Sequence, residues 1–196
     1  MRKLLVIFSL LCFSLHAQEK EKEWRIFCGF EMYYTSFLNT GNTMTQDAHR
    51  NYGGGFGFKL GVVEYQNIGF ELFYNHTRNK INDIAMIANF DHTRYNDYGL
   101  VFSYRIPLTE KTKLQPGIGY YVSKVKNTGR KKRAFYDGNG LLIGTEILFF
   151  TSNKIAIVGG IHYNYLRFNI NANSAYKNYF ADAHRIQFKI GFHFSR

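Results

Sequence analysis

The chain has 196 residues, of which 18% are aromatic, and it carries 25 Lys and Arg against 14 Asp and Glu, for a formal net charge of +11. This length suits one domain. Of the two cysteines, Cys12 lies in an apolar leader, so Cys28 alone excludes an intramolecular disulfide and a cysteine metal site in the exported chain.

The first 17 residues have the three parts of a secretory signal peptide. Arg2 and Lys3 precede an apolar run over residues 4–15, and a Leu-His-Ala tripeptide follows as a small-residue cleavage site. We therefore expect residues 1–17 to be a signal peptide and residues 18–196 to form the exported domain.

Two other interpretations of this leader are weaker. A retained transmembrane helix needs roughly 20 apolar residues, more than the leader has, and a lipoprotein would need a small residue where Leu11 precedes Cys12. No later segment has eighteen consecutive apolar residues, so strands must make any membrane crossing of the exported chain.

Eight segments of the exported chain place apolar residues at every second position. In the last of them, Ile186, Phe188 and Ile190 alternate with Gln187 and Lys189. Such alternation predicts β-strands with one apolar and one polar face. In chain order, the predicted strands cover residues 24–35, 52–63, 68–76, 97–106, 114–125, 140–149, 155–166 and 185–194.

The connections between these strands alternate in length. Short turns at residues 64–67, 107–112 and 151–153 interleave with long polar loops at residues 36–50, 78–94, 126–138 and 169–182. In outer-membrane barrels the short turns and both termini are periplasmic and the long loops face outward. The chain is therefore predicted to be all-β, an eight-stranded antiparallel transmembrane β-barrel with four long extracellular loops.

Glycine and tyrosine placement indicates which face points inward. Thirteen strand glycines share the polar parity, against Gly54 and Gly159 on the apolar parity, and small residues suit the narrow interior of an eight-stranded barrel. A soluble lipocalin-like barrel would instead turn its apolar face inward. A membrane-interface belt is predicted from tyrosines that lie on the apolar parity near the long-loop end: Tyr34, Tyr52, Tyr74, Tyr98, Tyr120 and Tyr163.

The chain resembles the OmpA/OmpX-like outer-membrane β-barrel proteins, especially the short barrels called porin family in Bacteroidota-type bacteria. The resemblance covers nearly all of the exported chain, and Lys189-Ile190-Gly191-Phe192-His193-Phe194 is similar to the terminal-strand signal of that family. It departs from the pattern by having Ser195 and Arg196 after the last aromatic residue. The resemblance implies a cell outer membrane location and recognition by the barrel assembly machinery.

Charged residues on the polar parity are expected to lie in the lumen. Charges withdrawn from water need partners, so a structural network that plugs the polar, glycine-rich lumen is favoured over a conduction path. The predicted lumen charge network consists of Arg25, Glu31, Lys59, Glu71, Arg105, Glu146, Arg185 and Lys189.

The third predicted outer loop is strongly basic. Such a run is usually solvated, but beside an outer membrane it suits contact with lipopolysaccharide phosphates, and an exported barrel makes nucleic acid an unsuitable partner. The possible glycolipid contacts are Lys126, Arg130, Lys131, Lys132 and Arg133.

Catalytic patterns are weak. A lipid-modifying outer-membrane enzyme would need Ser beside a His base, but neither His76 nor His162 has Ser two residues later. The histidines lack metal spacing, and no phosphate-binding glycine loop precedes a helix. We therefore predict no cofactor and no enzyme, but a structural or surface-interaction role through the outer loops. A narrow porin-like channel for small solutes is the first alternative and a lipid-modifying enzyme the second.

Overall fold

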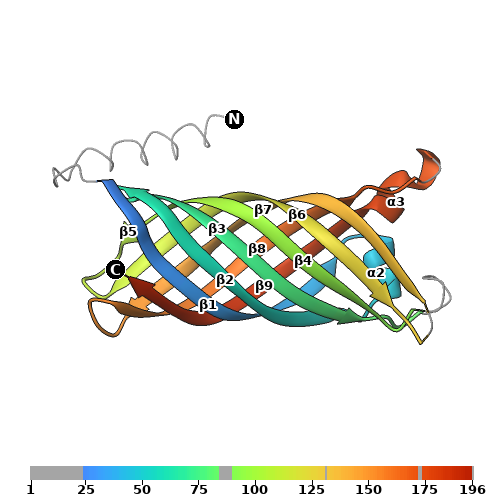
Figure 1. The fold of residues 1–196 in the computed structure, drawn as a ribbon, viewed down its shortest axis with the longest axis horizontal. Helices are drawn as coiled ribbons and strands as arrows, with labels where there is room; N and C mark the ends of the chain where they lie inside the picture. The colour runs from blue at the N-terminus through green and yellow to red at the C-terminus, as the bar shows by residue number, and fades with distance from the viewer. Residues whose placement is uncertain (1–23, 84–89, 131, 172–173, 196) are drawn as a thin grey trace.

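The computed structural model describes residues 24–83, 90–130, 132–171 and 174–195. Within them, nine strands form one antiparallel sheet in the order β4-β3-β2-β1-β9-β8-β7-β6-β5, and a further pairing of β4 with β6 closes it. Because β5 has only two residues and pairs only with β6, the wall has eight long strands. This closed barrel confirms the predicted fold (Figure 1).

The strands are β1 Trp24–Thr40, β2 Tyr52–Tyr65, β3 Ile68–Lys80, β4 His92–Tyr104, β5 Ile106–Pro107, β6 Thr112–Thr128, β7 Arg133–Phe150, β8 Ile155–Phe168 and β9 Asp182–Ser195. The short helices α2 Met44–Ala48 and α3 Lys177–Ala181, with a 3-10 turn at Ser174–Tyr176, lie at one end of the barrel. We call this the outer end. The inner end carries the short turns, the start of β1 and the end of β9 (Figure 1).

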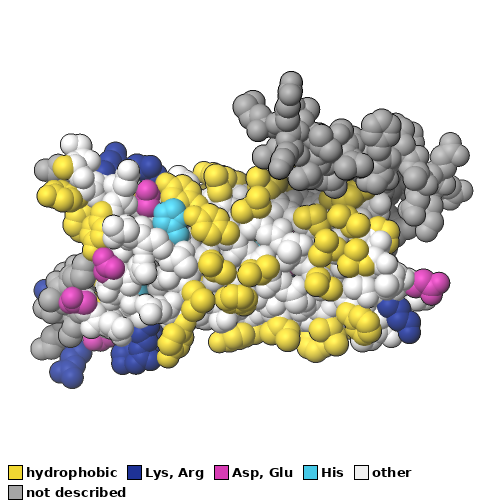
Figure 2. Space-filling model, turned by 180° about the vertical axis from the view of Figure 1, so that it is seen from behind, with side chains coloured by type: hydrophobic (Ala, Val, Ile, Leu, Met, Phe, Trp, Pro, Cys, Tyr) yellow, Lys and Arg dark blue, Asp and Glu magenta, His cyan; other side chains and the backbone are white. Residues whose placement is uncertain are grey.

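The apolar face of the sheet points away from the barrel axis. In β9, Phe188, Ile190 and Phe192 are 42%, 62% and 52% exposed, whereas the intervening Lys189 is 6% exposed. A water-soluble barrel would bury these side chains in its core, so the predicted membrane orientation is confirmed. Figure 2 shows the result as a broad hydrophobic band, with charged side chains gathered toward the outer end.

Inward glycines make room for aromatic side chains in the narrow lumen. A Cβ atom at Gly57 would lie 2.5 Å from the Tyr33 ring, and one at Gly140 would lie 2.2 Å from the Tyr121 ring. The bias of glycine toward the polar parity therefore follows from how large the opposing residues are.

The prediction of a third long outer loop at residues 126–138 was wrong. β6 continues to Thr128 and β7 begins at Arg133, with Thr128 opposite Arg133, so only residues 129–132 form the turn. The strands continue because Val125 and Asn127 keep pointing inward and are buried. The other outer connections, residues 41–51, 81–91 and 169–181, are also shorter than predicted, because β1, β3, β4, β8 and β9 extend beyond their predicted outer ends, whereas β2 begins at Tyr52 as predicted.

Candidate functional site

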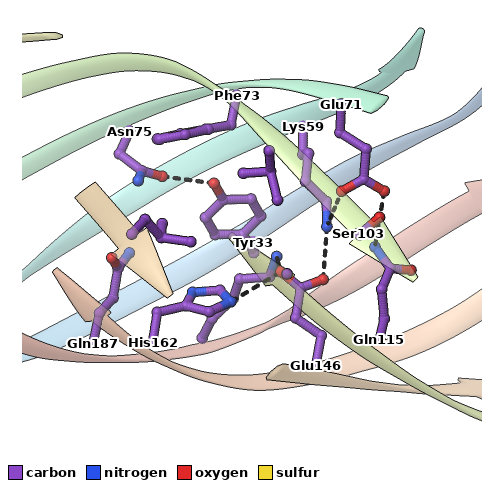
Figure 3. A pocket seen from close by; sticks show the side chains of 14 residues that line it. Tyr33, Lys59, Glu71, Phe73, Asn75, Ser103, Gln115, Glu146, His162 and Gln187 are labelled. Carbon is purple, nitrogen blue, oxygen red and sulfur yellow. Dashed lines mark hydrogen bonds and ion pairs between the residues drawn. The ribbon is translucent and has the colours of Figure 1, made fainter. Parts of the chain in front are cut away.

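The centre of the barrel holds a cluster of ion pairs from five strands. Lys59 Nζ on β2 lies 2.6 Å from Glu146 Oε2 on β7, 3.1 Å from Glu71 Oε2 on β3 and 3.5 Å from Glu31 Oε2 on β1. Lys189 Nζ on β9 lies 2.6 Å from Glu146 Oε1 and also pairs with Glu31. We call these five residues the central ion cluster; Figure 3 shows Lys59, Glu71 and Glu146 of it.

The barrel closure brings these side chains together. β2 and β7 are separated by β1, β9 and β8 in the sheet, so the Lys59–Glu146 contact crosses the lumen. Gly160, between Glu146 and Lys189 in the register, carries no side chain that would separate them.

Two histidines extend the central ion cluster. It has three carboxylates and two lysines, and His162 Nε2 lies 3.2 Å from Glu146 Oε1 while His193 Nδ1 lies 3.6 Å from Glu31 Oε2. All five charged side chains and both histidines are buried. The close opposite charges and imidazoles offset the loss of hydration that burial imposes.

Toward the inner end, Arg105 continues the polar layer. Arg105 Nη1 lies 2.7 Å from Glu64 Oε2, and Arg105 Nε donates to Gln115 Oε1 at 2.9 Å. The Gln115 amide donates in turn to Glu71 Oε1 at 2.8 Å. This chain of hydrogen bonds links the inner layer to the central ion cluster.

Toward the outer end, Arg185 is the centre of a second buried group. Its Nη2 lies 3.3 Å from Asp97 Oδ2 on the opposite wall and donates to the Tyr121 hydroxyl at 3.3 Å. Its guanidinium lies 4.8 Å from the centre of the Tyr95 ring. Apolar side chains fill the barrel around it: Phe37, Phe73, Tyr95, Val101, Tyr121, Val125, Leu142, Leu166, Phe168 and Ala183.

Little space remains within these layers. A cavity of about 20 Å³ lies among Tyr33, Lys59, Glu71 and Glu146, which is room for about one water molecule. A larger cavity of about 360 Å³ lies at the inner end beside Glu64 and Arg105.

Seven of the eight predicted lumen charges therefore lie inside the barrel in ion pairs; the side chain of Arg25 lies outside the described residues. Sequence reasoning missed Glu64 and Asp97 as members, because Glu64 was assigned to a turn and Asp97 to a strand end. It also missed His162 and His193, although both share the polar parity that identified the others.

The six predicted belt tyrosines all point outward, and they remain a proposed membrane-interface belt. Tyr34, Tyr52, Tyr98, Tyr120 and Tyr163 are 60%, 61%, 47%, 47% and 41% exposed, and Tyr74 is half-buried. The Tyr74 and Tyr98 rings lie 5.1 Å apart on neighbouring strands.

Helix α2 covers part of the outer end. Thr43 caps it, and Ala48 packs into a buried cluster with Ile81 and Phe90. His49 lies directly after it, with Nδ1 donating to the Thr45 carbonyl at 3.0 Å and Nε2 lying 2.6 Å from the Thr93 hydroxyl. Burial lowers the pKa of His49 to about 4 despite the opposing effect of the Thr45 carbonyl, so this histidine is neutral at pH 7.

The predicted glycolipid contacts lie on the β6–β7 hairpin. Arg130, Lys132 and Arg133 are exposed at its tip, and Lys126 is half-buried lower on β6 with its ammonium 5.3 Å from the Phe135 ring centre. Lys131 lies outside the described residues. Their contact with glycolipid stays a prediction.

Among the described residues, neither His76 nor His162 contacts a serine that it could activate as a nucleophile. His76 Nδ1 bonds the Asn96 side-chain oxygen at 2.7 Å, and His162 faces Glu146. Among the described residues, no group of three or more His, Cys, Asp or Glu side chains could hold a metal ion. No helix in that part of the chain is long and apolar enough to cross a membrane.

The family model for the outer membrane protein beta-barrel domain matches residues 5–194. The chain belongs to this family. It is therefore an outer-membrane β-barrel protein, as its outward apolar face requires. No curated protein shows significant sequence similarity to the chain.

Solved structures of outer-membrane barrels have the same fold. Neisserial surface protein A is 14% identical with a TM-score of 0.58, and the match covers 85% of this chain and 97% of that chain. Ail, the attachment invasion locus protein of Yersinia pestis, is 14% identical with a TM-score of 0.54 over 89% and 99% of the two chains. OprG from Pseudomonas aeruginosa is 10% identical with a TM-score of 0.56 over 86% and 96%. At these identities the likeness concerns the fold alone.

Proposed function

We propose that this protein is a sealed outer-membrane barrel that acts through its outer surface, as a structural or surface-interaction protein of the cell envelope. The single observation that carries the proposal is the filled lumen. A porin needs a continuous water-filled path along its axis. Here three stacked layers interrupt that path: the Arg105 layer, the central ion cluster and the apolar layer around Arg185.

Two of the layers resist opening because ion pairs tie them across the barrel. The Lys59–Glu146 pair joins β2 to β7, and the Arg185–Asp97 pair joins β9 to β4. Separating a buried pair leaves charges with neither water nor a partner, which is unfavourable by several kcal/mol. The cavity of about 20 Å³ in the central ion cluster is too small for a hydrated ion.

The outer end offers a defined surface. The Tyr179 hydroxyl donates to Asp47 Oδ2 at 2.8 Å, so α3 is tied to α2 over the barrel mouth. Two similar structures belong to a surface protein and to an attachment invasion locus protein, and both names suit a role in surface contact. Under this proposal the barrel holds its outer strands and helices in place for a partner.

Single-channel recording of the refolded chain in a planar bilayer tests the proposal, with a heat-modifiable gel shift as the control for folding. We expect a folded barrel that is electrically silent. Steady openings whose size follows the salt concentration would overturn the sealed barrel and favour the narrow channel for small solutes.

A further inference from the structure

Three basic side chains stand in one row on the outward face of the barrel, above the tyrosines. Arg78 on β3 lies opposite Arg94 on β4, and Arg94 lies opposite Lys126 on β6. The charges of all three act on the imidazole of His92. We call Arg78, Arg94 and Lys126 the basic row.

The basic row is unfavourable by itself. Neighbouring strands lie about 4.8 Å apart, and like charges directly opposite each other on a sheet repel. No carboxylate lies within ion-pair distance of Arg78, Arg94 or Lys126 in the described parts of the chain. Two acids lie nearby without forming an ion pair with the row. The charge of Asp91 also acts on the His92 imidazole, and Asp137 lies opposite Lys124 and accepts a hydrogen bond from Asn169 at 3.1 Å.

The row has the position of a lipid headgroup site. Tyr74 and Tyr98 mark the edge of the hydrophobic band on the same strands, and Arg78 and Arg94 lie four residues farther out. Four residues span about 13 Å along a strand, or about 10 Å in height once the strand tilt is included. Arg and Lys stems reach back over part of that distance, so their charges lie at the headgroup layer.

We propose that the basic row binds the phosphate of an anionic outer-leaflet glycolipid whose acyl chains lie along the apolar faces of β3, β4 and β6. The two guanidinium groups supply paired donors for phosphate oxygens and Lys126 adds a point charge. A bound phosphate also removes the repulsion within the row. The inference does not depend on whether the lumen conducts.

The test measures binding of bisphosphorylated lipid A to the refolded chain in neutral detergent micelles by native mass spectrometry. The row variant is Arg78→Gln/Arg94→Gln/Lys126→Gln. Its matched control is Lys111→Gln/Lys154→Gln/Lys177→Gln, which removes the same charge from exposed positions outside the basic row and outside the predicted glycolipid contacts. A heat-modifiable gel shift checks that each barrel is folded.

We expect the row variant to bind lipid A at least about ten-fold more weakly, the control within about two-fold of the parent chain, and dephosphorylated lipid A to bind weakly to all three. Should the triple variant not fold, Arg94→Gln alone is expected to weaken binding about three-fold. Unchanged binding in the row variant, equal losses in both triple variants, or equal binding of the dephosphorylated lipid would overturn the proposal.

Discussion

The charges inside the barrel and the charges on its outer rim are arranged in opposite ways. Inside, Lys59 and Lys189 each contact two or more carboxylates within 3.5 Å. On the rim, Arg78 and Arg94 face each other with no carboxylate within ion-pair distance among the described residues. The ion pairs inside the barrel stabilise the fold. The like charges of the basic row have no ion-pair partner among the described residues and therefore indicate that an external anion binds there.

The largest effect is expected when a central charge loses its partners. Lys189→Met leaves Glu31, Glu71 and Glu146 with Lys59 as the remaining lysine, which we expect to lower the free energy of unfolding by about 3–5 kcal/mol. Urea unfolding of the refolded barrel measures it. Lys154→Met, in an exposed inner turn, is the matched control and should change stability by less than about 0.5 kcal/mol. Equal midpoints for the two variants would contradict a paired interior.

His49 makes the outer end sensitive to pH. Because burial lowers its pKa from 6.5 to about 4 in the folded state, the unfolded chain binds the proton first as the pH falls. Neutral His49 therefore contributes its full share to the stability of the folded state above pH 6.5, and this contribution is lost as the pH falls from 6.5 to about 4. The loss is at most about 3 kcal/mol. Hydrogen exchange of the α2 amides measured across this range reports the loss.

A His49→Gln variant serves as the reference for that titration. In this variant the free energy of opening of the α2 amides, obtained after correction for intrinsic exchange rates, should stay constant from pH 7 to 4. The same slope in the variant and the parent chain would assign the pH effect to another group.

The Arg185 group should be more tolerant than the central ion cluster. Asp97→Ala removes its carboxylate partner, but the Tyr121 hydroxyl and the Phe37 and Tyr95 rings still contact the guanidinium. We expect a loss of about 2 kcal/mol in urea unfolding, smaller than that of Lys189→Met. A loss larger than that of Lys189→Met would reverse the proposed order of the two layers.

The smallest effect is expected on the rim. Arg94→Gln removes a charge that repels Arg78 and Lys126, so in neutral detergent the free energy of unfolding should stay within about 0.5 kcal/mol or rise slightly. Urea unfolding under the same conditions as for Lys189→Met provides the comparison. A loss above about 1 kcal/mol would mean that Arg94 has a structural partner.

The inward position of the charged residues could be predicted from the alternation of apolar and polar residues along the strands. Alternation placed Glu31, Lys59 and Lys189 on the inward face because successive side chains point to opposite sides of a strand. Parity cannot say which strands meet across the lumen. The Lys59–Glu146 contact joins residues on opposite walls, and register shifts between Ile26 and Gly29 and between Gly61 and Val63 alter the relative heights.

The outer end was harder to predict for a different reason. Beyond the hydrophobic band the outward residues of β6 and β7 are polar except for Phe135, so the apolar alternation that identifies a strand disappears although the pairing continues. Helix α2 has only five residues, too few to show a helical period, and its stability depends on Ala48 packing against Ile81 and Phe90 from a distant connection.

A double-mutant cycle on Lys189 and Glu146 tests most directly that the interior charges stabilise one another. The four proteins are the parent chain, Lys189→Met, Glu146→Gln and the double variant, all compared by urea unfolding in one detergent. We predict that the double variant loses less free energy of unfolding than the two single variants lose together, by at least about 1 kcal/mol. The reason is that each single variant leaves one charge of the pair without the other, whereas the double variant removes both. Strictly additive losses would show that the two side chains do not interact and would contradict the paired interior.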